Sequence, residues 1–190
     1  MKKVILSGFL VAATFFGAKA QSIKFGVKAG LNLAKLTDME AAKTKASFYG
    51  GGFVNIGLNK SWAIQPEVLY SGQGVKFSDK DVTETINTGY ISVPVMVQYH
   101  IVPSFYVEAG PQVSILASAK DKISGEATED LKKFMKGADF GAGIGCGFKI
   151  TDHFGVNARY VFGLSDVFKG DNVDTNSKNS VAQVGLFYQF

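Results

Sequence analysis

Apolar and polar residues alternate with a period of two through most of the sequence after residue 20, and this alternation constrains the fold more than any other feature. In residues 23–33, lysine, glycine and asparagine fill the positions between apolar ones. The apolar positions are Ile23, Phe25, Val27, Ala29, Leu31 and Leu33. Successive side chains of a β-strand point to opposite faces, so this pattern predicts a strand with one apolar face. Its length matches the roughly 9 to 11 residues with which a tilted strand crosses a bilayer.

The same alternation recurs along the chain and predicts eight strands. The segments are residues 23–33, 48–58, 62–70, 90–99, 105–115, 139–148, 154–164 and 181–190. Long polar connections (34–45, 76–88, 118–137, 165–179) alternate strictly with short ones (59–61, 100–104, 150–153). Outer-membrane barrels have this asymmetry, with short periplasmic turns and longer extracellular loops. We therefore predict an all-β fold: an eight-stranded antiparallel up-and-down transmembrane β-barrel.

The first twenty residues have the pattern of a cleaved signal peptide. Lys2 and Lys3 precede an almost wholly apolar stretch at 4–16, and residues 18–20 (Ala-Lys-Ala) supply the small residues of a cleavage site. The stretch is shorter than the roughly 20 residues of a spanning helix, and no cysteine follows the cut for lipid attachment. We predict that residues 1–20 are removed on export and that residues 21–190 form one barrel domain.

Removal of the signal peptide changes the charge of the chain. The full sequence has 20 Lys and Arg against 16 Asp and Glu, and the signal peptide holds three of the basic residues and none of the acidic ones. The mature protein therefore has 17 basic and 16 acidic residues, a net charge of +1, which gives no support for a nucleic-acid partner. Cys146 is the only cysteine, so no intramolecular disulfide forms.

The composition of the two strand faces indicates which one points into the barrel. A soluble lipocalin-like barrel would turn its apolar face inward. Here the polar face is rich in glycine, whereas the apolar face carries aromatic residues near strand ends, as in the girdles of membrane barrels. These aromatic residues are Trp62, Tyr70, Tyr99, Phe105, Phe148, Phe154, Tyr188 and Phe190. We predict that the apolar face contacts lipid and that glycines relieve crowding in the narrow interior.

Charged residues also fall on the predicted inner face. They are Glu67, Glu108, Asp139 and Arg159, with Lys24 and Lys28. An unpaired buried charge is costly, so we predict that Arg159 and the carboxylates form a structural ion-pair network inside the barrel. Paired carboxylates also serve glycosidases and proteases, but no nucleophile or histidine base accompanies these ones. We therefore predict no catalytic residues.

The remaining motifs indicate no cofactor or metal. His100 and His153 lie in separate predicted turns and make a weak metal site. The glycines at 141, 143, 145 and 147 are spaced by two, as on a strand, and do not open a helix, so they are not a dinucleotide fingerprint. Residues 128–136 have the capping and charge pattern of a short amphipathic helix, which would cover the barrel mouth or bind a membrane surface or partner.

Short motifs on the predicted strands carry a family resemblance. They are GVKAGLN at 26–32, QPEVLYS at 65–71, ISVPV at 91–95, VEAGP at 107–111 and ARY at 158–160. With these motifs, residues 21–190 resemble the PorT-like, porin-family outer-membrane β-barrel proteins of Gram-negative bacteria. Tyr188 and Phe190 resemble the C-terminal signal, ending in an aromatic residue, that barrel-assembly machinery recognises. The resemblance implies an outer-membrane location, with membrane lipid and that machinery as partners.

Several functions fit such a barrel. We expect a monomeric, non-enzymatic protein with a structural or interaction role that presents four loops outside the cell. Eight strands leave no open channel, unlike the roughly 16 to 18 strands of porins, although a narrow water-filled path through the interior is an alternative. A module that binds a small molecule or protein with its long loops is a second alternative. An outer-membrane enzyme would need a Ser/His or His/Asp group near one rim, and a lipocalin-like barrel would be soluble.

Overall fold

The computed structural model describes residues 22–36, 42–79, 82–123, 129–130, 136–166 and 178–190. The predicted signal peptide therefore lies outside the described residues. The long strands are β1 (Ser22–Leu36), β3 (Lys45–Gly57), β4 (Trp62–Asp79), β5 (Val82–Val102), β6 (Phe105–Ile123), β8 (Ala138–Lys149), β9 (Phe154–Asp166) and β10 (Lys178–Gln189). Two short strands, β2 (Ala42–Lys43) and β7 (Glu129–Asp130), pair with β4 and β6. The described part of the chain contains no helix long and apolar enough to cross a membrane.

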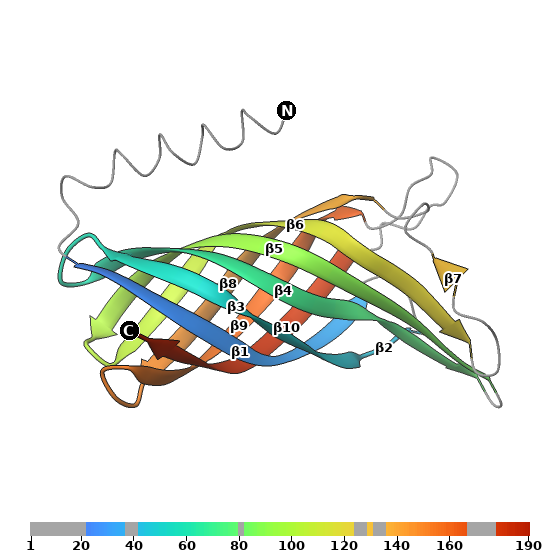
Figure 1. The fold of residues 1–190 in the computed structure, drawn as a ribbon, viewed down its shortest axis with the longest axis horizontal. Coiled ribbons are helices and arrows are strands. Elements are labelled where there is room, and N and C mark those ends of the chain that lie inside the picture. The colour runs from blue at the N-terminus through green and yellow to red at the C-terminus, as the bar shows by residue number, and fades with distance from the viewer. Residues whose placement is uncertain (1–21, 37–41, 80–81, 124–128, 131–135, 167–177) are drawn as a thin grey trace.

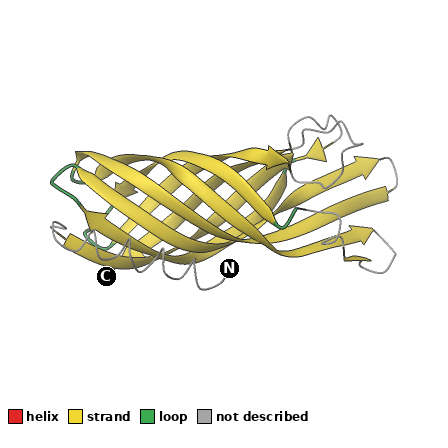
Figure 2. Cartoon of the chain, turned by 90° about the horizontal axis from the view of Figure 1, so that it is seen from above, coloured by secondary structure: helices red, strands yellow, loops and turns green. Residues whose placement is uncertain are grey.

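The eight long strands form a closed antiparallel barrel (Figures 1 and 2). Each pairs with the next along the chain, and β1 pairs with β10 from Gly26↔Gln189 to Leu36↔Asn179. Closure leaves the part of the barrel where all eight long strands pair without an open edge, and a sheet embedded in lipid needs such closure. The predicted eight-stranded barrel is thereby confirmed. We call the end with the three short connections and the strand termini Ser22 and Gln189 the turn end, and the opposite end the loop end.

The two faces of the barrel have the predicted orientation. Inward side chains such as Asn32 and Gln98 are buried, whereas Phe25, Leu31 and Val184 point outward and are 59%, 63% and 61% exposed. An apolar surface of this extent is suited to lipid rather than to water.

Aromatic rings lie near both ends of the apolar surface. Trp62 and Tyr99 are register partners near the turn end, with ring centroids 4.8 Å apart. Phe48 and Tyr70 lie nearer the loop end, with centroids 5.7 Å apart. This distribution matches the two aromatic girdles of a membrane barrel.

Three neighbouring strands are longer than the alternation predicts. β4, β5 and β6 contain 18, 21 and 19 residues, whereas β8, β9 and β10 contain 12 or 13. Pairing continues to Asp79↔Val82 between β4 and β5, and to Glu84↔Ile123 between β5 and β6 (Figure 1). The prediction of a loop at 76–88 is therefore wrong. Backbone hydrogen bonding extends the ladder through a segment rich in β-branched Val, Thr and Ile, where the apolar alternation has already faded.

The predicted helix at 128–136 is wrong where the structure describes it. Glu129 and Asp130 form β7, which pairs with Asp121 and Lys120 of β6. The extended β6 offers backbone partners to this segment, and strand pairing takes precedence over the local helix pattern. The rest of the predicted helix, apart from Lys136, lies outside the described residues.

Candidate functional site in the barrel interior

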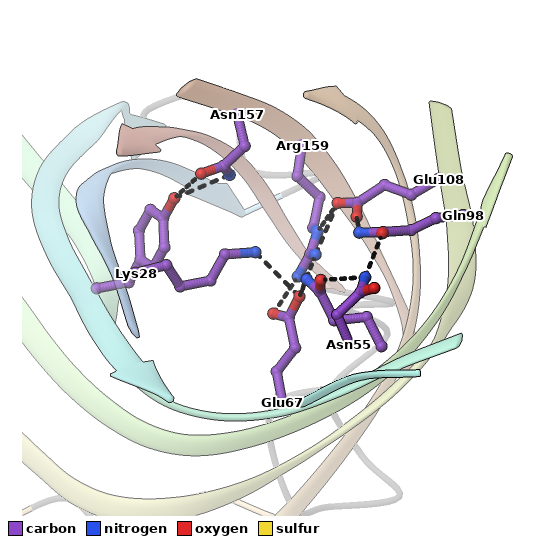
Figure 3. Close-up of polar contacts among 9 residues, drawn as sticks. Lys28, Asn55, Glu67, Gln98, Glu108, Asn157 and Arg159 are labelled. Atoms are coloured by element: carbon purple, nitrogen blue, oxygen red, sulfur yellow. Dashed lines mark hydrogen bonds and ion pairs between the residues drawn. The ribbon is translucent and has the colours of Figure 1, made fainter. Parts of the chain in front are cut away.

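Four charged side chains from four strands meet inside the barrel and form what we call the ionic layer (Figure 3). They are Lys28 of β1, Glu67 of β4, Glu108 of β6 and Arg159 of β9. Each of these side chains is at most 1% exposed. β4 and β9 stand opposite each other in the barrel, four strands apart in either direction, so the layer crosses the lumen.

The guanidinium group of Arg159 links both carboxylates. Its Nη1 and Nη2 donate to Oε2 and Oε1 of Glu67 at 2.9 and 2.7 Å, and its Nε donates to Oε1 of Glu108 at 2.8 Å. Lys28 Nζ donates to Glu67 Oε1 at 2.9 Å. Two cations and two anions give a neutral layer in which every charge has a partner, the condition under which buried ion pairs are tolerated.

Inward glycines make room for the layer. Arg159 lies opposite Gly145 in the β8–β9 register, where a Cβ would come 3.2 Å from Cβ of Arg159. On the other side of the barrel, Lys28 pairs with Gly51 of β3. The missing side chain at Gly145 leaves the long arginine side chain space to extend across the lumen, whereas a Cβ at Gly51 would meet the backbone of Val68 and Leu69.

Three buried or half-buried amides lie next to the ionic layer on its turn-end side. Gln65 Nε2 donates to Glu67 Oε1 at 2.8 Å, and Gln98 Nε2 donates to Glu108 Oε2 at 3.0 Å. Asn55 Nδ2 donates to Oε1 of both glutamines, at 3.0 and 2.8 Å. These amides were not among the predicted site residues, although their positions on the polar face of the predicted strands were a signal for them.

Side chains also fill the interior on both sides of the ionic layer. Toward the turn end, Phe53, Tyr106 and Phe187 form a buried aromatic cluster. Toward the loop end, Asn32 Nδ2 donates to Gly72 O at 2.7 Å and to Ser71 Oγ at 2.9 Å, and Gln183 donates to Asn32 Oδ1 at 3.0 Å. An eight-stranded barrel is just wide enough to be filled in this way.

Aromatic rings in the interior lie over glycines of the neighbouring strand. Four register pairs share this arrangement: Gly26↔Phe53, Gly30↔Tyr49, Tyr106↔Gly147 and Phe187↔Gly155. A Cβ at any of these glycines would approach Cε1 of its ring within 2.6 to 2.8 Å. Glycine is therefore required at these positions by close packing, in line with the predicted role of glycines on the inner face.

Asp139 does not belong to the ionic layer, contrary to the prediction that placed it with Arg159. It lies near the loop end, where its carboxylate accepts hydrogen bonds from Ser165 Oγ at 2.6 Å and from Asn179 Nδ2 at 2.8 Å. Arg159 lies opposite Gly145, six residues farther along β8, which is about 20 Å at roughly 3.3 Å per residue. Asp139 shares the inner face with Arg159 but not its height in the barrel. Lys24 also lies apart, exposed near the turn end.

Both histidines lie at the turn end. The His100 ring is 5.4 Å from that of Tyr106, and His153 Nδ1 is 2.8 Å from Gln189 O. Among the described residues, no three His, Cys, Asp or Glu side chains group together as a metal site would require.

The C-terminal residues lie at the seam that closes the barrel. Phe190 N donates to Phe25 O at 2.8 Å, which joins the chain end to β1. Tyr188 and Phe190 point outward, 44% and 67% exposed, with ring centroids 5.4 Å apart. Their recognition by assembly machinery stays a prediction.

A closed barrel with an apolar outer face and a filled polar interior defines the class of integral membrane β-barrels. Residues 19–169 match the family model described as "Outer membrane protein beta-barrel domain". The chain therefore belongs to this family.

Solved structures share the fold. Neisserial surface protein A is 14% identical with a TM-score of 0.59, and the match covers 90% of this chain and 100% of that one. The attachment invasion locus protein Ail of Yersinia pestis, solved with the heparin analogue sucrose octasulfate, is 15% identical with a TM-score of 0.54 and the same coverage. These identities establish likeness of fold alone. No curated protein sequence gives a significant match.

Proposed function

We propose that this protein is a non-enzymatic, monomeric barrel of the outer membrane whose interior is closed to solutes. It acts as a structural element or presents its loop end to partners. The observation that carries the proposal is the ionic layer, which crosses the lumen with every charge paired and every side chain at most 1% exposed. Moving ions through the barrel would require breaking these buried pairs, which is costly.

The location and the finer family placement belong to the same proposal. The exposed apolar face and the family match support residence in the outer membrane. The signal-peptide pattern at 1–20 supports export, and the motifs at 26–32 and 65–71 support a PorT-like, porin-family relative. Membrane lipid and the barrel-assembly machinery are the partners that this placement implies.

Fractionation followed by conductance measurement tests the proposal. The full chain is expressed in a Gram-negative host, and the outer-membrane fraction is run on a denaturing gel with and without boiling. We expect a boiling-dependent mobility shift and, after purification into planar bilayers, no conductance steps beyond those of a boiled, unfolded control. Reproducible steps from the folded protein would refute the closed interior. A soluble periplasmic protein without the shift would instead indicate a soluble barrel.

Binding at the loop end is a second candidate function, favoured by the extension of β4, β5 and β6. Paired strands hold their backbone in place, so binding a partner there would cost this chain less conformational entropy than binding through a flexible loop. A variant in which residues 76–85 are replaced by a two-residue Asn-Gly turn joins the register partners Val75 and Ile86, so it would keep the barrel and shorten the β4–β5 extension. Comparing cells that display the two forms for adhesion to host proteins or glycans tests this role. Equal adhesion would count against it.

A further inference from the structure

Two buried glutamine side chains inside the barrel each leave one polar atom without a partner. Gln73 of β4 and Gln189 of β10 are both 4% exposed, and Oε1 of each accepts no hydrogen bond. Among the described residues, these two oxygen atoms are the buried side-chain atoms that have no hydrogen-bond partner. Native proteins pair nearly all buried polar atoms, and ordered water is a common partner where no protein group is within reach.

Each of these oxygen atoms belongs to a residue that lines a small cavity. The turn-side cavity has a volume of about 10 Å³, and its lining includes Gln189, Asn55, Lys28 and Lys149. The loop-side cavity also has a volume of about 10 Å³, and its lining includes Gln73, Gln112, Ser114, Asp139 and Asn179. A volume of roughly 10 to 15 Å³ is what one water molecule needs, and both linings offer the several polar groups that a buried water contacts.

The charges around each cavity disfavour one sign of ion, and the unpaired carbonyl oxygen at each needs a hydrogen-bond donor. Two lysines line the turn-side cavity, which disfavours a cation there, whereas the carboxylate of Asp139 lines the loop-side cavity and disfavours an anion. A water molecule is neutral, donates to a carbonyl oxygen and accepts from an amide. It therefore suits both cavities.

The two cavities lie on opposite sides of the ionic layer. They share no lining residue. Of the ionic layer, Lys28 lines the turn-side cavity, and Glu67, Glu108 and Arg159 line neither of the two. Gln65, which lines the turn-side cavity, and Gln73 are eight residues apart on β4, or about 26 Å at roughly 3.3 Å per residue. The hydrogen-bonded carboxylates and guanidinium group occupy the space between them.

We propose that the barrel holds two structural water molecules, one bound by Gln73 and one by Gln189, and that the ionic layer keeps them from joining into a continuous file. The presence of the waters stands on the two cavities alone, whereas their separation rests on the proposed closed interior. The barrel would then be hydrated from both ends without providing a path through its middle.

Water-selective NMR on the full folded protein in detergent micelles tests the proposal. We expect cross-peaks between long-lived water and the side-chain amide protons of Gln73 and Gln189, and none to Nε–H of Arg159. Gln73→Met removes the acceptor at similar volume and should abolish the first water signal while leaving the second. Gln189→Met should do the reverse.

Gln183→Met is the matched control, because Gln183 is also 4% exposed but donates to Asn32 and lines neither cavity. It should leave both water signals in place. Since the unmodified protein already gives the decisive spectrum, a variant that fails to fold does not remove the test.

Three outcomes would overturn the proposal. Absence of water cross-peaks at both glutamines, in a spectrum that resolves other interior amides, would refute the water sites. A Gln73 signal that changes when the monovalent cation of the buffer is exchanged would identify an ion there instead. A strong water cross-peak at Arg159 would refute the separation. Conductance through the folded barrel would refute the proposed function, and the separation of the waters with it, while leaving the two glutamine signals intact.

Discussion

Replacing Arg159 by methionine tests the energetic role of the ionic layer most directly. Arg159 donates to both carboxylates, so its loss leaves Glu108 with the amide of Gln98 and leaves Glu67 with Lys28 and Gln65. The layer then carries a net charge of −1 in a space where the side chains are at most 1% exposed. Removing one partner of a buried ion pair costs about 3–5 kcal/mol. We expect a decrease of that size in the free energy of unfolding.

Equilibrium unfolding in urea, with the protein folded into lipid vesicles, measures this decrease. Trp62 is the only tryptophan and lies 44% exposed on the outer face, so its fluorescence reports on insertion without a label. The gel mobility shift on boiling gives a second readout. Arg159→Lys keeps the charge but loses the planar group that binds Glu67 through two nitrogen atoms. We therefore expect its free energy of unfolding to lie between those of the native protein and the methionine variant.

A second substitution separates charge balance from packing. Arg159→Met combined with Glu108→Gln leaves one cation, Lys28, against one carboxylate, Glu67, and restores neutrality. The double variant should therefore be more stable than Arg159→Met alone, even though it lacks one more native group. If the free energy of unfolding of Arg159→Met lay within about 1 kcal/mol of the native value, the buried ion pairs would not govern the stability of the barrel. A double variant less stable than Arg159→Met would lead to the same conclusion.

The fold and the sequence support four further predictions. Gly147→Val should lower the free energy of unfolding by about 1–3 kcal/mol or more, because its Cβ would collide with the ring of Tyr106, and urea unfolding would detect no change if the ring can move aside. Ile144→Arg, on the lipid face near the middle of β8, should cost about 2–4 kcal/mol in the same assay, and a neutral effect would count against a membrane setting. Deleting Phe190 should reduce the yield of the heat-modifiable form in cells without abolishing refolding of the purified protein. An unchanged yield would show that Phe190 is not needed as an assembly signal. N-terminal sequencing of the exported protein should begin at residue 21, and an intact residue 1 would contradict the signal peptide.

The sequence determined the strands and their faces. Alternation with a period of two is a local property, because side-chain direction in a strand depends only on position along it. Phe25 could therefore be assigned to the lipid face and Lys28 to the interior from neighbouring residues alone. The even strand count and the alternation of short and long connections then indicated a closed up-and-down barrel, which the β1–β10 pairing confirmed.

The tertiary structure alone decided which interior residues meet. Arg159 and Glu67 are 92 residues apart, and their contact depends on the stagger of every strand pair between them. Asp139 has the same inward direction and the same chemistry as Glu67, yet it lies about 20 Å along β8 from the position opposite Arg159. The extent of β4, β5 and β6 was likewise set by backbone pairing between strands. The pattern along one strand fixes the face to which each side chain points. The height of each side chain in the barrel is fixed only when the ladder of hydrogen bonds closes on itself.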